Sequence, residues 1–182
     1  MSIKKANNFC VCIVENWWQR TDLLLGEDGR LRLEGSRVLV VGVGGVGAYA
    51  LEMLVRSGVG CVDIIDGDVV GVTNLNRQLP ALNSTLGKPK VDVLKERMLD
   101  INPNLKIDAV CGLAKAVRDR LKKLGIRKKL KVVWSSEQPS KSALTLTNEI
   151  ACKVSSYGTV SFLPAVFGCY LAAFVIRKIS ER

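Results

Sequence analysis

Blocks of apolar residues, separated by turns rich in glycine or proline, predict alternating strands and helices in the first 112 residues. The first expected strand is apolar throughout, which is typical of a strand buried on both faces of a sheet. Strands are expected at 38–43, 61–66 and 105–110, and helices at 48–57 and 87–103. This order indicates an α/β fold, a Rossmann-like, mainly parallel sheet with flanking helices and right-handed crossovers.

Three segments lie outside this alternation of strands and helices. Residues 16–36 predict a helical arm with a turn at 26–29, and residues 67–80 predict a polar loop of functional length. Residues 154–176 carry no charge and are long enough to span a membrane. Their serines, their glycines and Pro164 instead favour a strand, a turn at Pro164 and a buried helix. We therefore expect no stable membrane span.

The chain has 182 residues and a hydrophobic content of 48%, which suits one domain with its own core. Its charge is concentrated in one stretch. Residues 113–131 hold nine Lys or Arg and one Asp, so they supply +8 of the total net charge of +10. Such a block attracts polyanions, RNA above all. A solvated helix face followed by a loop would have the same composition.

The cysteine and histidine content argues against a zinc site and against two classes of catalytic site. None of the six cysteines forms a C-x-x-C pair, which argues against a structural zinc site. The chain has no histidine, which excludes Ser-His-Asp and Cys-His catalysis. Free thiols in a reducing cytoplasm account for the cysteines, which are Cys10, Cys12, Cys61, Cys111, Cys152 and Cys169.

A glycine cluster joins the first expected strand to the first expected helix. Gly42, Gly44 and Gly47 form G-x-G-x-x-G, and Gly45 adds a fourth glycine. Such a turn lets the backbone approach a phosphate, and the helix that follows offers unpaired N–H groups. Asp66 ends the second strand, where it could accept hydrogen bonds from a ribose. The pattern indicates a half-site for NAD or ATP, or else a turn that only packs helix against strand.

The residues around this turn indicate which of the two nucleotides, NAD or ATP, the half-site would bind. Asn74, Asn76, Arg77 and Gln78 follow in the polar loop, Lys90 begins the next helix, and Arg20 lies in the arm. Three cations near one turn favour a triphosphate attacked at its α-phosphorus, because negative charge then grows on the phosphate oxygens. The alternative is that the cations are surface residues and the asparagines form Asx-turns.

Four of these motifs in order resemble the ATP-binding core of the ubiquitin-activating-enzyme superfamily: G-x-G-G-x-G, DGDVV (66–70), TNLNRQ (73–78) and GKPK (87–90). Within that superfamily, QRTDLLLGEDG (19–29) and GTVSFLPAVFGCYLAA (158–173) resemble the tRNA threonylcarbamoyladenosine dehydratase family. The resemblance extends over about residues 18–179. It implies one ATP-binding domain over 1–182, with an arm (1–36), a nucleotide-binding half (37–112) and a basic helix, strands and a buried helix (113–182).

The resemblance also implies an activity. The family adenylates the carboxylate of N6-threonylcarbamoyladenosine in tRNA with ATP and Mg²⁺, and the modification then cyclises with loss of AMP. Arg20 matches an arm arginine that reaches into the partner subunit's site, which implies a homodimer. The basic stretch would face tRNA. The implied ATP contacts are the turn glycines for the phosphates, Asp66 for the ribose, Asp68, Asn74 and Asn76 for the pocket, and Arg77 and Lys90 for the phosphates.

One departure from the family bears on the activity. The family has a further strand ending in a D-x-x-D motif whose Asp helps to bind Mg²⁺, and here residues 108–112 run directly into the basic stretch. At least two strand–helix units are missing, so we expect weak ATP binding and little turnover. The alternatives are an adenylyltransferase for a ubiquitin-like sulfur-carrier protein with a sulfur-relay partner, a non-catalytic tRNA-binding module and, last, an NAD-dependent oxidoreductase.

Overall fold

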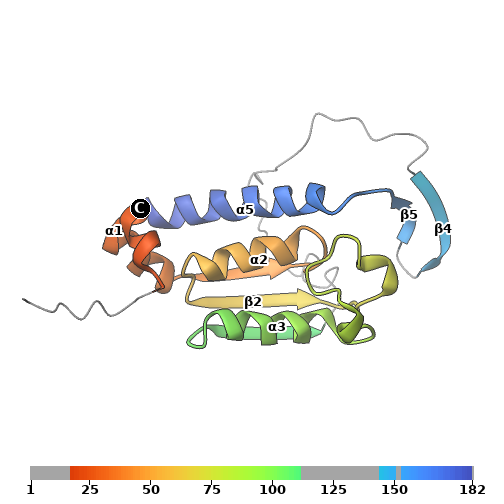
Figure 1. Ribbon diagram of the computed structural model, residues 1–182, viewed down its shortest axis with the longest axis horizontal. Helices are drawn as coiled ribbons and strands as arrows, with labels where there is room; N and C mark the ends of the chain where they lie inside the picture. Colours follow the sequence, from red (N-terminus) through yellow and green to blue (C-terminus); the bar gives the residue numbers. More distant parts are fainter. Residues whose placement is uncertain (1–16, 112–143, 151–152, 182) are drawn as a thin grey trace, which may run out of the picture.

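Three parallel strands form the central sheet of the computed structural model, which describes residues 17–111, 144–150 and 153–181 (Figure 1). The strands lie in the order β1-β2-β3, with Val38 opposite Val62 and Val62 opposite Ile107. They are β1 (Arg37–Val41), β2 (Cys61–Asp66) and β3 (Lys106–Cys111). The predicted Rossmann-like α/β fold is confirmed. The basic helix expected within 113–131 lies outside the described residues.

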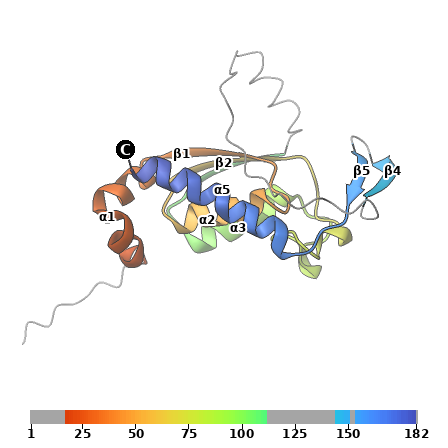
Figure 2. The same cartoon turned by 90° about the horizontal axis from the view of Figure 1, so that it is seen from above.

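Three helices, α2, α3 and α5, lie on one face of this sheet (Figure 2). Helix α2 (Gly47–Arg56) joins β1 to β2, and α3 (Lys90–Ile101) joins β2 to β3. Two successive right-handed crossovers between neighbouring strands place both helices on the same side. Helix α5 (Phe162–Ser180) packs beside α2. The apolar face of α2 is buried in this core, at Leu51, Leu54 and Val55.

The other face of the sheet carries no helix within the described ranges, which corrects one prediction. Residues 38–43 were expected to form a strand buried on both faces, but Leu39 is 45% exposed, and Val110 on β3 is 51% exposed. Burial alternates along β1, with half-buried Val38 and Val40 toward the helices. The cause is topological, because β1 is an edge strand of the described sheet and the crossovers cover only one face.

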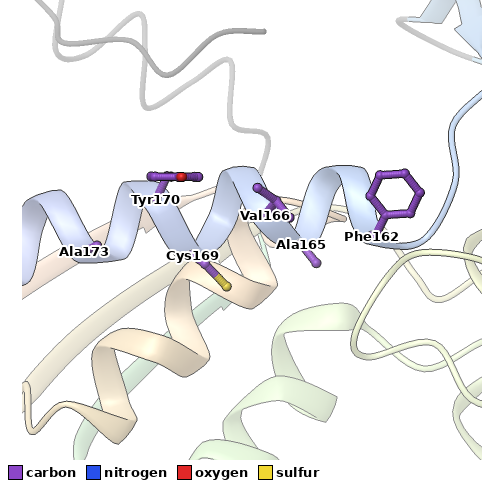
Figure 3. A pocket seen from close by; sticks show the side chains of 6 residues that line it. All are labelled: Phe162, Ala165, Val166, Cys169, Tyr170 and Ala173. Carbon is purple, nitrogen blue, oxygen red and sulfur yellow. The ribbon is translucent and has the colours of Figure 1, made fainter.

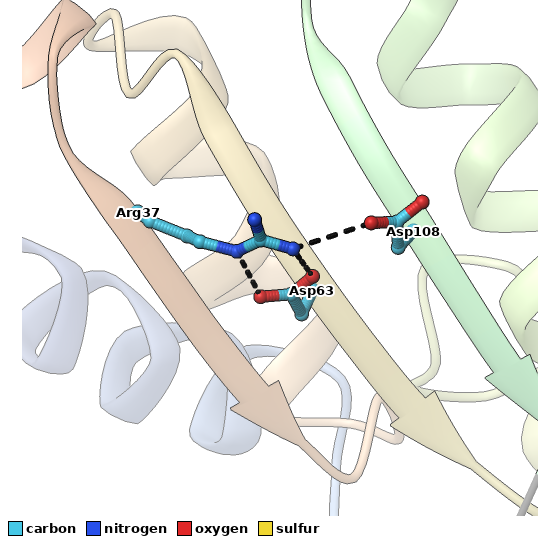
Figure 4. Close-up of polar contacts among 3 residues, drawn as sticks. All are labelled: Arg37, Asp63 and Asp108. Atoms are coloured by element: carbon cyan, nitrogen blue, oxygen red, sulfur yellow. Dashed lines mark hydrogen bonds and ion pairs between the residues drawn. The ribbon is translucent and has the colours of Figure 1, made fainter.

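Charged side chains cross this open face at its amino-terminal end (Figure 4). Arg37 Nε donates to Asp63 Oδ2 at 2.7 Å, and Arg37 Nη2 donates to Asp108 Oδ2 at 3.2 Å. The hydrogen bond from Arg37 lowers the pKa of Asp63. One guanidinium thus bridges two carboxylates that the strand register places side by side.

Helix α1 (Gln19–Glu34) closes the amino-terminal end of the sheet. It continues through the predicted turn at 26–29, but it kinks at Gly26, where φ is 71°. The Leu33 carbonyl accepts a hydrogen bond from Gly60 N–H at 3.2 Å, and the Arg32 guanidinium donates to the Ser180 carbonyl at the end of α5. These contacts hold α1 at the end opposite to the glycine turn (Figure 1).

The C-terminal segment corrects two further predictions. Strands β4 (Leu144–Ile150) and β5 (Lys153–Tyr157) form an antiparallel pair, of which only β5 was expected. Helix α5 begins at Phe162, so Pro164 lies in its first turn, where a missing N–H costs no hydrogen bond. The expected buried helix is buried only at Gly168, Ala172 and Ser180. By length and composition α5 is a candidate membrane span, a test that core helices also pass.

Helices α2 and α3 are joined by one buried carboxylate. Glu52 accepts hydrogen bonds from Arg56 Nε at 2.8 Å and from Arg97 Nε at 2.7 Å. Burial raises the pKa of Glu52, but the hydrogen bonds from Arg97 and Arg56 outweigh it and leave the pKa below its ordinary value of 4.5. A carboxyl with a lowered pKa stabilises the fold above that ordinary value and loses its contribution as the pH falls through the folded-state pKa.

We predict that Glu52→Gln lowers the free energy of unfolding at neutral pH by about 1–3 kcal/mol, because it removes charge-assisted hydrogen bonds. The deficit should shrink in acid, where Glu52 itself becomes protonated. Urea unfolding of both proteins at neutral and acidic pH measures this. Glu96→Gln, at an exposed position of the same helix as Arg97, is the control and should be silent. A deficit that is unchanged in acid would contradict the prediction.

Candidate functional site

The glycine turn between β1 and α2 depends on glycine for its backbone shape at two positions. Gly42 has φ of 87°, and its N–H donates to the Ile65 carbonyl at 2.8 Å. A Cβ at Gly47 would overlap with the carbonyl oxygen of Gly42. These two glycines are therefore needed to pack the helix on the strand, whether or not a ligand binds.

The other two glycines face side chains that follow β2. A Cβ at Gly44 would lie 3.8 Å from Nε2 of Gln78, and one at Gly45 would lie 3.7 Å from Cγ of Arg77. The structure thus brings Arg77 against the turn, as predicted from the sequence. Helix α2 starts there without a side-chain cap, and its positive dipole end faces the turn, although Ala48 N–H already donates to the Gly44 carbonyl at 3.1 Å.

Asp66 ties the turn to the loop after β2. Its Oδ2 accepts a hydrogen bond from Val43 N–H at 2.7 Å, and its Oδ1 accepts one from Asp68 N–H at 2.8 Å. The carboxylate is buried. Each oxygen has a second lone pair, so a ribose hydroxyl could still donate to it. Its first role is nevertheless structural, because it holds the turn and the loop in one position.

The loop 67–89 is folded by its own polar side chains, in part through the short 3₁₀ helices η1 (Val72–Asn74) and η2 (Asn83–Thr85). Asn74 Oδ1 accepts a hydrogen bond from Gly71 N–H at 3.1 Å. Arg77 Nη1 donates to Asn76 Oδ1 at 2.8 Å and to the Thr73 carbonyl at 2.7 Å. Asn74 and Asn76 therefore shape the loop and orient Arg77.

Lys90 occupies a different setting from Arg77. It begins α3 and is only 3% exposed, and its Nζ donates to Asp68 Oδ2 at 2.9 Å. Lys90 N–H also donates to the Asp68 carbonyl, at 3.1 Å. A phosphate at this position would have to share the ammonium group with Asp68, whose side chain is largely exposed.

Gln78 was predicted only as one of the amides around the turn, without a contact of its own. Its side chain lies over Gly44, and its Oε1 is buried without a hydrogen-bond partner among the described residues. Amide groups can rotate, so the NH₂ group can be turned toward an anion at the turn. The signal was present in the sequence, because Gln78 ends the same TNLNRQ stretch.

Arg20 is the one predicted site residue that the structure keeps away from the others. It lies exposed on α1, at the amino-terminal end of the sheet, whereas the glycine turn lies at the carboxyl ends of the strands (Figure 1). Arg20 and the glycine turn of one chain therefore cannot contact the same phosphate.

The donor set of the described residues fits a nucleotide triphosphate, and these same residues offer Mg²⁺ no group of three protein ligands. For ATP it offers the N-terminus of α2, the Arg77 guanidinium and the Gln78 amide. For Mg²⁺, no three His, Cys, Asp or Glu side chains gather anywhere in 17–111, 144–150 and 153–181. Asp66 is engaged by two N–H groups and Asp68 by Lys90. Of the cysteine thiols, those of Cys61 and Cys169 are described, and both are free.

Comparison with known proteins agrees with the nucleotide interpretation. The model of the ThiF family matches residues 19–134. The tRNA threonylcarbamoyladenosine dehydratase of Bacillus subtilis is 50% identical over 93 residues, 51% of this chain and 37% of that protein. The solved structure of the E. coli tRNA N6-threonylcarbamoyladenosine dehydratase with ATP superposes with a TM-score of 0.52 at 40% identity, covering 57% of this chain and 44% of that one.

A further solved structure shares the fold alone. PaaA superposes with a TM-score of 0.67 at 18% identity and covers 98% of this chain and 70% of its own. The chain spans less than half the length of the two dehydratases above.

We predict that Asp66→Asn destabilises the protein by about 1–3 kcal/mol, because a buried N–H of the turn or of the loop loses its charged acceptor. Urea unfolding measures the loss. Asp28→Asn, at an exposed position of α1, is the control and should unfold at the wild-type midpoint. Equal midpoints for all three proteins would contradict a structural role for Asp66.

Proposed function

The chain belongs to the ThiF family, and we propose that it binds ATP at the glycine turn and acts as a dehydratase on N6-threonylcarbamoyladenosine in tRNA. The observation that carries the proposal is the position of Arg77, whose side chain lies against Gly45 beside the uncapped start of α2. A cation at this point suits a phosphate that gains negative charge during reaction. The chain spans only part of the relatives that it matches, so substrate and activity are proposed, not inherited.

The proposed chemistry has two steps. The carboxylate of the modified base forms a bond to the α-phosphorus of ATP, and pyrophosphate leaves. A nitrogen of the same modification then attacks the activated carbonyl, AMP leaves, and a ring remains. The two steps together remove one molecule of water from the base. The protein must hold the phosphates in line and stabilise charge on them, which needs no nucleophilic side chain.

Each described site residue has a place in this scheme. The turn glycines and the N-terminus of α2 hold the phosphates, Arg77 stabilises the developing charge, and Gln78 adds an amide. Asp66 holds the turn in shape and offers a remaining lone pair to the ribose. Lys90 would share its charge between Asp68 and a phosphate. Asn74 and Asn76 orient the loop.

The proposal extends to partners. The nine basic residues of 113–131 support tRNA as the substrate by their charge. Because Arg20 lies at the far end of the sheet, it can serve a glycine turn only from a second copy of the chain. We expect weak ATP binding and low turnover in a cytoplasmic enzyme, because the sequence lacks the D-x-x-D segment whose Asp helps to bind Mg²⁺ in the family that it resembles.

We predict that the chain catalyses exchange between ATP and pyrophosphate only with tRNA that carries N6-threonylcarbamoyladenosine. Arg77→Ala should lower the exchange rate on the order of 10²-fold, the usual cost of one lost donor to a transition-state oxygen. The control is Arg37→Ala, at the opposite end of the sheet, which should leave the rate unchanged. Exchange is measured with labelled pyrophosphate.

Three results would favour another function or contradict part of the proposal. Exchange that requires a ubiquitin-like carrier protein instead of tRNA would favour the adenylyltransferase alternative. Binding of tRNA by folded protein without exchange would favour a non-catalytic module. Exchange as fast as that of a full-length dehydratase would contradict the expected impairment.

A further inference from the structure

The segment that leads into α5 contacts the loop that carries Arg77. This segment, residues 158–161, joins β5 to α5. Asn76 Nδ2 donates a hydrogen bond to the Thr159 carbonyl at 3.1 Å. The two residues are 83 positions apart, so the contact forms only in the folded chain. It ties a C-terminal segment to the candidate phosphate site.

The oxygen of the same amide group binds Arg77. Asn76 Oδ1 accepts a hydrogen bond from Arg77 Nη1 at 2.8 Å. A backbone carbonyl can only accept a hydrogen bond and a guanidinium can only donate one, so a single orientation of the amide serves both neighbours. With the amide turned over, its NH₂ group would face the donors of Arg77. The Thr159 carbonyl therefore selects the orientation in which Asn76 accepts from Arg77.

The backbone of this part of the loop is held without the Asn76 side chain. The N–H groups of Arg77 and Gln78 both donate to the Asn74 carbonyl, at 3.1 Å and 2.9 Å. The Arg77 side chain also donates from Nη1 to the Thr73 carbonyl, at 2.7 Å. An arginine side chain has many rotamers, and a single contact near the surface does not restrict all of them. The Asn76 side chain thus bears on the direction of the guanidinium and not on the path of the loop.

The first turn of α5 lies against the aliphatic part of the same arginine. A Cβ at Gly45 would lie 3.1 Å from Cβ of Pro164 and 3.7 Å from Cγ of Arg77, so both side chains lie over this glycine. Helix α5 is fixed at this end, because Gly168 packs against the backbone of Val46 at the start of α2. The stem and the head of Arg77 therefore both contact groups that α5 and its preceding segment hold in place.

We propose that Asn76 is a positioning residue, which the segment before α5 holds in the orientation that aims the Arg77 guanidinium at the glycine turn. Arg77 touches the phosphate, and Asn76 acts only through Arg77. Residues 158–164 then belong to the site, although they give no group to the nucleotide. The kinetic consequences rest on the proposed function, whereas the orientation of Arg77 does not.

Steady-state kinetics of the exchange between ATP and pyrophosphate test this role. Asn76→Ala should lower kcat about 10–100-fold, the usual cost of losing an outer partner that orients a site residue. The KM for ATP should change far less, because the glycine turn and the start of α2 are untouched. Asn83→Ala, the same change at another exposed asparagine of this loop, is the matched control and should behave as wild type. Urea unfolding checks that both variants are folded.

A variant in α5 tests the part assigned to that helix. Pro164→Ala removes the ring over Gly45 and should lower kcat in the same direction as Asn76→Ala. The control is Val166→Ala on the same helix, at a 46% exposed position between Phe162 and Tyr170 (Figure 3). A folded Pro164→Ala variant with the kcat of wild type would contradict the part assigned to α5.

A double-mutant cycle separates positioning from a direct role of Asn76. If Asn76 acts only through Arg77, the double variant of Asn76→Ala and Arg77→Ala should be as slow as Arg77→Ala alone, within about twofold. Losses that multiply would show that Asn76 acts on the reaction by itself, and they would overturn the proposal.

The orientation of Arg77 can also be measured without nucleotide or tRNA. In NMR spectra of the arginine side chains, the Nε–H signal that disappears in Arg77→Ala belongs to Arg77. This signal should show restricted motion in wild type and in Asn83→Ala, and free motion in Asn76→Ala. Equal restriction in Asn76→Ala would overturn the proposal. Restriction that depends on Asn76, in a protein without exchange activity, would support the positioning of Arg77 and contradict the proposed function alone.

Discussion

The buried carboxylate of Asp66 holds the candidate site together. It accepts one N–H from the glycine turn and one from the loop after β2, so it links segments that come from two different crossovers. The loop then carries Arg77 and Gln78 back against the same turn. A buried charge of this kind is tolerated only when hydrogen bonds satisfy it. The geometry of the candidate phosphate site thus depends on one side chain at the end of one strand.

Within the described residues, the sheet around this site is open on one face. With three strands in consecutive order, both crossover helices and α5 cover one side, while Leu39 and Val110 remain exposed on the other. The Arg37, Asp63 and Asp108 cluster makes the amino-terminal part of that face polar. The carboxyl-terminal part is apolar, and it lies next to the strand ends that position the glycine turn. A site built on an open sheet has fewer packed neighbours to hold its loops than one enclosed on both faces.

Helix α5 links the two ends of the molecule. Its first turn reaches the glycine turn through Pro164, and its last turn holds α1 through Arg32 and Ser180. The side of α5 that packs on α2 carries small residues, which let α2 approach closely. The outer side carries exposed aromatic rings. A hydropathy pattern averages these two faces, which is why an apolar run without charges suggested a buried helix.

The sequence by itself determined the order of strands and helices, the position of the glycine turn and the identity of Asp66 and Arg77 as its neighbours. These features are local, since they follow from periodicity and from motifs within a few residues. Only the tertiary structure decided which faces are exposed, as β1 and α5 demonstrate, because burial depends on what packs opposite an element. It also decided that Lys90 is paired with Asp68, that Gln78 lies over Gly44, and that Arg20 is at the far end of the sheet. Each of these depends on contacts between segments distant along the chain, which no local pattern encodes.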